Sequence, residues 1–262
     1  MRRKITEFCY EIDVNLFPTT DQIASSLVKV FSTASAVAGN ATLGALVPHQ
    51  KIPTRMISLV PEYEMEELCK FVNQFRSYIK LQPTQMVETS RCKVLIYCHI
   101  MEAEFPATVI WNLLRLIQGD SPLWTFSDFP GDRYQKIREL SEMCKLSIGS
   151  ILSNLWCNKL RNAFSHAQYL LHEDGCFLGT RNISPVTAES LKSSDLPQSG
   201  GENPYFFRPN EIDAFFEGAL SYLKVFIENY HSSCEPFKNG NWYNIPTGPI
   251  RWEDERGWWS TT

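Results

Sequence analysis

The chain has 262 residues, of which 44% are hydrophobic, and it carries a formal net charge of −4. This apolar fraction is too high for a disordered chain, and the length suits one principal hydrophobic core better than two full domains. The negative charge excludes a globally basic nucleic-acid-binding surface, so any contact with RNA has to be local.

The eight cysteines are scattered, with no C-x-x-C pair and no histidine at zinc-ligand spacing. We therefore expect free thiols, a cytoplasmic location, and neither a metal site nor a cofactor. Residues 1–4, three of which are basic, are followed by acidic residues where the apolar run of a signal peptide would begin, which argues against secretion. The least polar later stretch, 27–47, is interrupted by polar residues, so no membrane span is expected.

The first predicted helix covers residues 21–38, where apolar side chains recur at three- and four-residue steps and Thr20 or Asp21 can serve as the N-cap. Residues 39–61 carry turn signals and predict turns or short extended pieces. A second helix is expected after Pro61, because acidic residues fill its first turns, where the helix dipole favours negative charge.

The long apolar segment 87–118 predicts a helix that Pro106 kinks or splits. A loop is expected over residues 119–131, followed by a helix from about Arg133 to Met143. The next helix is expected to run without a break over residues 149–170. Beyond it, an Asp-Gly pair between two apolar runs predicts a β-hairpin.

Residues 184–203 are rich in Ser, Gly, Pro and charge, and predict a mobile excursion. A last helix is expected after Pro209, with Asn210 as its cap and Tyr230 near its end. The tail after Pro236 contains several tryptophans without clear periodicity, and we expect it to wrap over the helical body.

The most informative segment lies within the helix predicted over residues 149–170. Its apolar side chains form one inward stripe, and polar groups gather on the opposite face. These polar groups comprise a cation, an amide, a hydroxyl, an imidazole and a phenol, from Arg161, Asn162, Ser165, His166 and Tyr169. Asn162 is expected one helical turn before His166.

Those groups suit RNA cleavage by attack of the ribose 2′-hydroxyl on the adjacent phosphate. The hydroxyl must lose a proton, and His166 can act as general base or acid because imidazole titrates near working pH. Arg161 can stabilise the charge that builds on the phosphate oxygens, and Asn162 can orient the imidazole or the phosphate. No metal is required. The candidate substrate-binding residues are Ser165, Tyr169 and Lys159.

One histidine can play only one role at a time, and no second histidine lies at a helix-compatible distance on this face. A twofold homodimer formed through the motif helix would bring two copies of the same patch together. Arg161 and His166 of both subunits would then form one composite site.

Residues 161–166 read Arg-Asn-Ala-Phe-Ser-His, which resembles the R-x-x-x-x-H motif of the HEPN family. The resemblance implies a mainly α fold, an up-and-down helical bundle with a small β-hairpin after the motif helix, and dimerisation through that helix. It also implies metal-independent RNA cleavage in many members, often in toxin–antitoxin or phage-defence systems, with an antitoxin or defence protein as partner. The expected division is an N-terminal helical extension packed on the core (1–61), a HEPN-like helical domain (62–231) and a Trp-rich tail (232–262).

Two other interpretations of the motif stay open. Arg161, Asn162 and His166 could lie on a solvated helix face or in a buried polar network between helices. The domain could also be a non-catalytic dimerisation module with a silent site, which binds a partner protein or a nucleotide.

Other reactive residues are weaker candidates. His99 with Glu102 and Glu104 could suggest a metal-binding helix, but a single imidazole inside an apolar run predicts a core or partly satisfied histidine. His172 is expected to face solvent in the hairpin turn. Cys157 has no histidine or aspartate arranged to activate it, so we expect a small packing residue.

Overall fold

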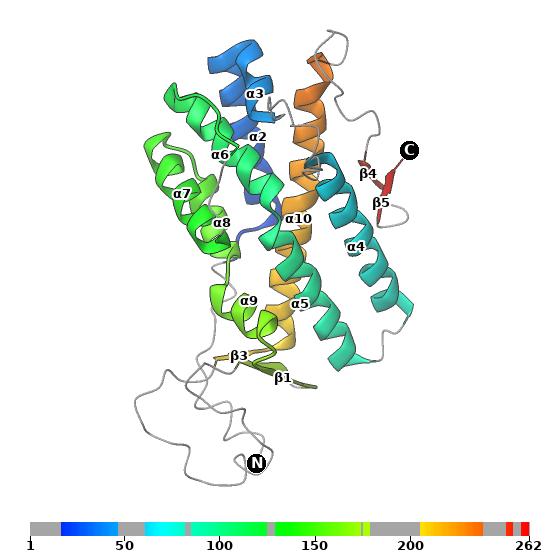
Figure 1. Ribbon diagram of the computed structural model, residues 1–262. Coiled ribbons are helices and arrows are strands. Elements are labelled where there is room, and N and C mark those ends of the chain that lie inside the picture. Colours follow the sequence, from blue (N-terminus) through cyan, green and yellow to red (C-terminus); the bar gives the residue numbers. More distant parts are fainter. Residues whose placement is uncertain are drawn as a thin grey trace, which may run out of the picture.

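A computed structural model describes residues 17–46, 61–81, 85–124, 129–173, 175–178, 205–237, 250–253 and 258–261. Over these residues the protein is mainly helical, with one three-stranded and one two-stranded antiparallel sheet (Figure 1). The predicted mainly α class is therefore confirmed. The excursion predicted for residues 184–203 lies outside the described residues.

The helices are α2 (Thr20–Ala38), α3 (Leu43–Leu46), α4 (Pro61–Leu81), α5 (Met86–Glu102), α6 (Glu104–Gln118), α7 (Pro130–Met143), α8 (Ile148–Leu155), α9 (Asn158–Ser165) and α10 (Pro209–Cys234). Two 3₁₀ turns, Gly39–Thr42 and Glu235–Phe237, follow α2 and α10. The strands are β1 (Tyr169–His172), β2 (Gly175–Leu178), β3 (Tyr205–Phe207), β4 (Ile250–Glu253) and β5 (Trp258–Thr261).

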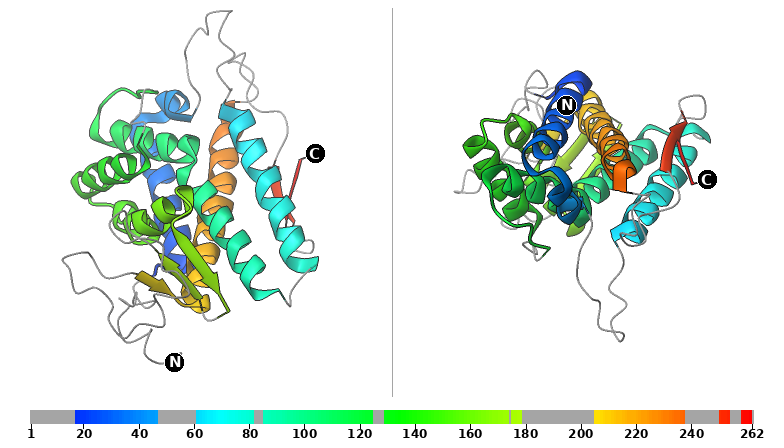
Figure 2. Two further views of the ribbon diagram at one scale, coloured as in Figure 1. Left: turned by 60° about the horizontal axis from the view of Figure 1, so that its bottom comes forward. Right: turned by 90° about the horizontal axis from the view of Figure 1, so that it is seen from above.

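The central helix of the fold is α10, which is apolar around most of its circumference, as expected for a helix with neighbours on several sides. It packs against α2 and α5 (Figure 2), while α2 also contacts α6 and α8. Side chains from α2 and from the later helices belong to one contiguous core, which includes the fully buried rings of Tyr97, Tyr222 and Phe226. The helices expected on the two sides of residue 61 therefore share this core.

Several helix starts differ from the sequence-based prediction. The N-cap of α2 is Thr19, whose hydroxyl accepts a hydrogen bond from the backbone N–H of Gln22 (3.2 Å), and not Thr20 or Asp21. Helix α10 begins at Pro209, directly after Arg208 as its N-cap, and Asn210 is not the cap. Proline favours this first helical position because its fixed φ is already helical and its missing N–H is not needed there.

Two connecting segments also differ from prediction. The turns expected after residue 39 are partly helical, because a 3₁₀ turn and the buried helix α3 follow α2. Helix α7 begins at Pro130, three residues earlier than predicted, and again has proline in its first turn. The rest of the segment before Pro61, residues 47–60, lies outside the described part of the chain.

The long apolar segment splits at Ala103, three residues before the proline that was expected to mark the kink. In an α-helix the ring of Pro106 would clash with the carbonyl group four residues earlier, which belongs to Glu102. Helix α5 ends at Glu102, Ala103 adopts φ −55° and ψ 125°, and Pro106 lies in the first turn of α6. The proline therefore ends one helix and is accommodated at the start of the next.

Within the described residues, one stretch, Met86–Gln118, has the length and composition of a membrane span. It comprises α5 and α6, and 67% of the apolar window is buried inside the protein. Core helices of soluble proteins pass the same test, so this stretch is weak evidence for a membrane span.

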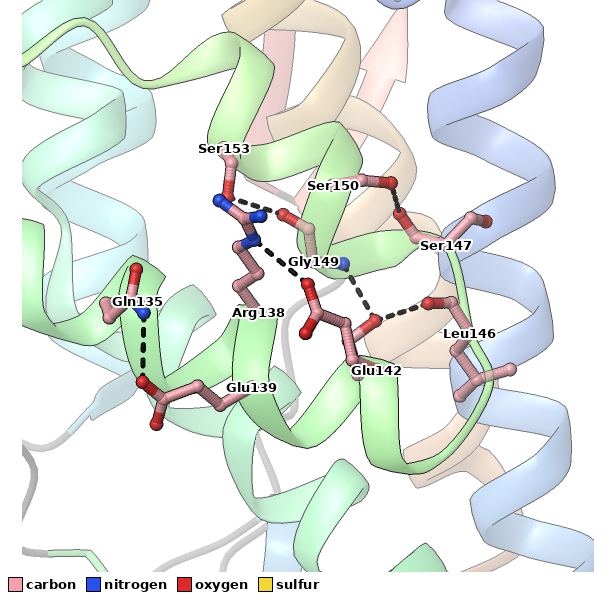
Figure 3. A network of polar contacts seen from close by, with 10 residues as sticks. Gln135, Arg138, Glu139, Glu142, Leu146, Ser147, Gly149, Ser150 and Ser153 are labelled. Atoms are coloured by element: carbon pink, nitrogen blue, oxygen red, sulfur yellow. Dashed lines mark hydrogen bonds and ion pairs between the residues drawn. The ribbon is translucent and has the colours of Figure 1, made fainter.

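A polar network joins α7 to α8 (Figure 3). The buried hydroxyl of Ser141 donates a hydrogen bond to the Leu146 carbonyl (2.6 Å) and accepts one from the Gly149 N–H (3.0 Å). A Cβ at Gly149 would lie 2.6 Å from the Cα of Arg138, so glycine permits the close approach of the two helices. On the surface of α7, Arg138 pairs with Glu142 (3.0 Å). This corner fixes the start of α8 and thereby the direction of the chain that leads to α9.

The hairpin predicted after the motif is confirmed as β1 and β2, which pair antiparallel with Tyr169 opposite Leu178 and His172 opposite Gly175. Strand β3 joins the other edge of β2, and its Phe207 is buried. The Trp-rich tail contributes a second hairpin, β4–β5, beside α4 and α10. Apolar and polar residues alternate only over the four residues Ile250–Glu253, a run too short to predict this hairpin from the sequence.

Candidate functional site

The motif lies on a short separate helix, so the prediction of one continuous helix over residues 149–170 is wrong. Helix α8 ends at Leu155 and α9 begins at Asn158. The fully buried hydroxyl of Tyr97 in α5 donates a hydrogen bond to the Leu155 carbonyl (2.8 Å) and accepts one from the Cys157 N–H (2.8 Å). One side chain from another helix therefore satisfies backbone groups on both sides of the break.

His166 is the C-cap residue of α9 rather than a residue within the helix. Its N–H donates to the Asn162 carbonyl (3.0 Å), which places Asn162 one turn earlier, as predicted. The next residue, Ala167, has φ 53°, and the N–H of Gln168 donates back to the Ala163 carbonyl (2.7 Å). Together with the bond from the Ala167 N–H to the Phe164 carbonyl (3.2 Å), the Gln168 bond forms a Schellman motif in which alanine occupies the left-handed position that glycine normally fills.

Tyr169 lies on β1, so the expected helical face with five polar groups is divided between a helix, its cap and a strand. The Tyr169 ring stacks on Phe164 of α9, with ring centroids 4.1 Å apart and planes at 9°. This contact connects the hairpin to the last turn of the motif helix. One face of the predicted substrate-binding phenol is thus occupied by another residue of the chain.

The guanidinium of Arg161 joins α9 to α5. Its Nε donates a hydrogen bond to the carboxylate of Glu102, and its Nη1 donates to Oδ1 of Asn162 (3.0 Å). The side chains of Arg161 and Glu102 are 26% and 33% exposed, so the ion pair is not sealed inside the core. No described residue accepts a hydrogen bond from Nη2 of Arg161, and its N–H groups can therefore reach an anionic ligand.

Glu102 is the site residue that sequence reasoning missed. In the sequence, Glu102 was a candidate only as a metal ligand beside His99, and its 59-residue separation from Arg161 hides their contact. In the sequence, Pro106 was the available signal for this residue, because it places Glu102 at a helix end. A side chain at a helix end can reach across to a neighbouring helix.

The remaining predicted residues of α9 and its cap are accessible. Lys159, Ser165 and His166 are exposed, and Asn162 is partly exposed. The imidazole of His166 makes no hydrogen bond to any residue that the structure describes. The ring is therefore accessible to a ligand.

The thiols close to the motif are not activated nucleophiles. Burial raises the pKa of Cys157, although the backbone N–H groups of Lys159 and Leu160 oppose the shift. Burial also raises the pKa of Cys98, with a further contribution from the charge of Glu102. Thiols with raised pKa values stay protonated near neutral pH, which agrees with a packing role for Cys157.

Of the two sequence-based expectations for His99, a core or a partly satisfied histidine, the core position is wrong. It is exposed on α5, and its ring lies against that of Phe71, with centroids 4.1 Å apart. Partial burial lowers the pKa of His99, and the charge of Glu102 opposes this shift. Among the residues that the structure describes, no group of three or more His, Cys, Asp or Glu side chains could hold a metal ion.

The arrangement presents a partly exposed guanidinium, fixed by two oxygen acceptors, and an exposed imidazole at the end of the same short helix. A fixed cation and a titratable base suit a phosphodiester ligand.

The chain matches no family model, no curated protein and no solved structure in three separate comparisons.

Proposed function

We propose that the protein is a metal-independent endoribonuclease with a HEPN-like fold, and that residues 161–166 are its R-x-x-x-x-H motif. The observation that supports this function best is the presentation of Arg161. Glu102 and Asn162 hold its guanidinium while Nη2 keeps its N–H groups for a ligand, and His166 is exposed at the end of the same helix.

In the proposed reaction the His166 imidazole removes the proton from a ribose 2′-hydroxyl. The 2′-oxygen then forms a bond to phosphorus, the bond from phosphorus to the 5′-oxygen breaks, and the leaving oxygen takes up a proton. The products are a 2′,3′-cyclic phosphate and a 5′-hydroxyl. Arg161 stabilises the charge on the non-bridging oxygens, and Asn162 keeps the guanidinium in place.

The proton for the leaving oxygen comes from a second acid, and we propose that it is His166 of a second copy of the chain. A twofold contact between exposed ends of α9 would place two imidazoles at one phosphate. Lys159 and Ser165 are exposed on this helix and are proposed to contact the RNA backbone. Tyr169 is retained as a substrate-binding residue through the ring face that Phe164 does not cover.

The test compares wild type with His166→Ala and Arg161→Ala on a labelled single-stranded RNA in the presence of EDTA. Each substitution is expected to reduce cleavage by roughly 10²- to 10³-fold, because each removes a proton-transfer group or a transition-state donor. Arg138→Ala and His231→Gln are the matched controls, since both residues lie outside the site, and they should cleave like wild type. Replacing the 2′-hydroxyl at the scissile position by hydrogen should abolish cleavage.

Equal cleavage by folded His166→Ala and wild-type protein would exclude this active site. Light scattering after gel filtration tests the dimer, and a fully active monomer would exclude the composite arrangement. The toxin–antitoxin or phage-defence setting, with an antitoxin as partner, is proposed from the HEPN resemblance of the motif.

The Arg161–Glu102 contact also favours a second candidate function. An ion pair between α9 and α5 is what a structural role for the motif would require. The protein would then be a non-catalytic dimerisation module that binds a partner protein or a nucleotide. A dimer that binds such a partner and cleaves no RNA, with or without added metal, would support this function.

A further inference from the structure

The end of α5 is held by two residues of α7. A helix end leaves carbonyl groups without intrahelical partners, and Pro106 enforces such an end at Glu102. The Tyr134 hydroxyl donates a hydrogen bond to the carbonyl of Met101 (2.8 Å), and Nη1 of Arg133 donates to the carbonyl of Glu102 (3.1 Å). Both donors are buried, so the last turn of α5 is fixed from within the protein.

Arg133 also spans the break between α5 and α6. Its Nη2 donates to the carboxylate of Glu104 (3.3 Å), so one guanidinium binds a backbone group before Ala103 and a side chain after it. A planar guanidinium with several donors suits such a bridge, and lysine could make only part of it. The path of the chain around Ala103 is thereby constrained on both sides.

Tyr134 connects the same turn to the segment that precedes the motif helix. Its ring packs against Trp156, with centroids 5.1 Å apart, and Trp156 lies in the connection between α8 and α9. Burial raises the pKa of Tyr134, so its hydroxyl keeps the proton that it donates to α5. Helix α7 therefore contacts both the end of α5 and the chain that leads into α9.

We propose that Arg133 and Tyr134 are positioning residues for Arg161, acting through Glu102. Glu102 is bound at two points: Arg133 binds its backbone carbonyl, and Arg161 binds its carboxylate. Fixing this backbone fixes where the carboxylate lies and hence which way the guanidinium points. The expected loss of kcat rests on the proposed nuclease function. The expected change in the orientation of Arg161 does not.

The kinetic test uses Arg133→Gln, Arg133→Lys and Tyr134→Phe in the full chain, with a single-stranded RNA as substrate. Arg133→Gln is expected to lower kcat roughly tenfold with KM changed less than about twofold, because misplacing a transition-state donor affects the chemical step. Arg133→Lys should recover part of the loss. Arg138→Gln is the matched control, since this arginine of α7 pairs with Glu142 at the surface and with no other residue that the structure describes, and it should leave both constants unchanged.

A double-variant test separates positioning from general destabilisation. If Arg133 acts through Glu102, adding Arg133→Gln to the Glu102→Gln enzyme should lower kcat by less than about twofold. The reason is that Glu102→Gln has already removed the ion pair with Arg161 that Arg133 supports. If the fold-decrease in kcat of the double variant equals the product of the fold-decreases of the two single variants, the proposal is overturned. Tyr134→Phe removes only a hydroxyl group, so the same test applies to it if Arg133→Gln fails to fold.

A readout independent of activity is the NMR signal of the Arg161 Nε–H, assigned as the resonance lost in Arg161→Lys. Hydrogen bonding to Glu102 protects this proton from exchange with water, and Arg133→Gln or Tyr134→Phe should broaden or shift the signal. Arg138→Gln should not change it. If wild type cleaves no RNA but the signal responds in this way, the nuclease proposal fails and the positioning inference stands. A signal unchanged in both variants would overturn the inference.

Discussion

The Nε of Arg161 in α9 donates a hydrogen bond to the carboxylate of Glu102, the last residue of α5. The two residues are 59 positions apart and belong to helices that contact each other (Figure 1). This pair sets the orientation of the proposed phosphate-binding guanidinium, because Asn162 constrains it at only one further nitrogen.

Removing the charge of Glu102 is expected to impair RNA cleavage. Glu102→Gln leaves Arg161 without its anionic partner, so we expect kcat to fall by roughly tenfold to a hundredfold as the guanidinium samples unproductive orientations. Steady-state cleavage kinetics measure the change. Glu142→Gln breaks an exposed ion pair in α7 and serves as the control. A kcat equal to that of wild type would show that Glu102 does not orient Arg161.

The Tyr97 hydroxyl is expected to stabilise the break between α8 and α9. Tyr97→Phe removes the partner of the Leu155 carbonyl and of the Cys157 N–H, and should lower the free energy of unfolding by about 1–3 kcal/mol. Urea titration followed by circular dichroism measures this change. Tyr222→Phe is the control, because its buried hydroxyl has no hydrogen-bond partner among the described residues, and its loss should not destabilise the protein.

Ala167 should tolerate glycine better than a β-branched residue, because its φ is 53°. Ala167→Gly is expected to raise the free energy of unfolding by up to about 1 kcal/mol, and Ala167→Val to lower it by about 1–2 kcal/mol. Thermal unfolding of the two variants ranks them directly. The opposite ranking would contradict the left-handed conformation that ends α9 after His166.

The corner between α7 and α8 should not accept a methyl group at Gly149. In Gly149→Ala the Cβ would lie 2.6 Å from the Cα of Arg138, which is backbone and cannot move aside without shifting a helix. We expect a loss of about 1–3 kcal/mol in the free energy of unfolding, measured by guanidinium titration. At Gly131 the nearest atom, in Trp156, is 3.9 Å away, so Gly131→Ala should cost much less. Equal losses would argue against the close helix contact.

We expect the free energy of unfolding to depend on pH through the protonation of His99. Its pKa in the folded protein is lowered by partial burial, so protonation favours the unfolded chain. Above about pH 6.5, the ordinary histidine pKa, both states are neutral and the group adds no pH dependence. As the pH falls below this value the unfolded chain binds the proton more readily and stability decreases, until the folded-state pKa is reached.

Urea titrations at pH 7.5 and 5.5 on wild type and His99→Gln measure this effect. The loss of stability between the two pH values should be smaller in His99→Gln, whatever its stability at pH 7.5. An equal loss in both proteins would show that His99 does not contribute.

The amino-acid sequence by itself determined the helical class, most of the helix positions and the hairpin after the motif. Each amphipathic helix has to bury its apolar stripe, and this requirement appears in the sequence as a three- to four-residue period whatever the stripe packs against. The R-x-x-x-x-H spacing likewise identified Arg161, Asn162 and His166 as a candidate site from residues that are close in the chain.

Only the tertiary structure decided where the motif helix begins and what holds its arginine. The hydroxyl of Tyr97 satisfies backbone groups on both sides of the break before α9, and the carboxylate of Glu102 binds Arg161. Both side chains are supplied by α5. Local periodicity shows that a segment is buried, but it does not reveal which distant side chain satisfies a backbone group or pairs with a charge. Those partners exist only once α5, α7 and α9 have packed together.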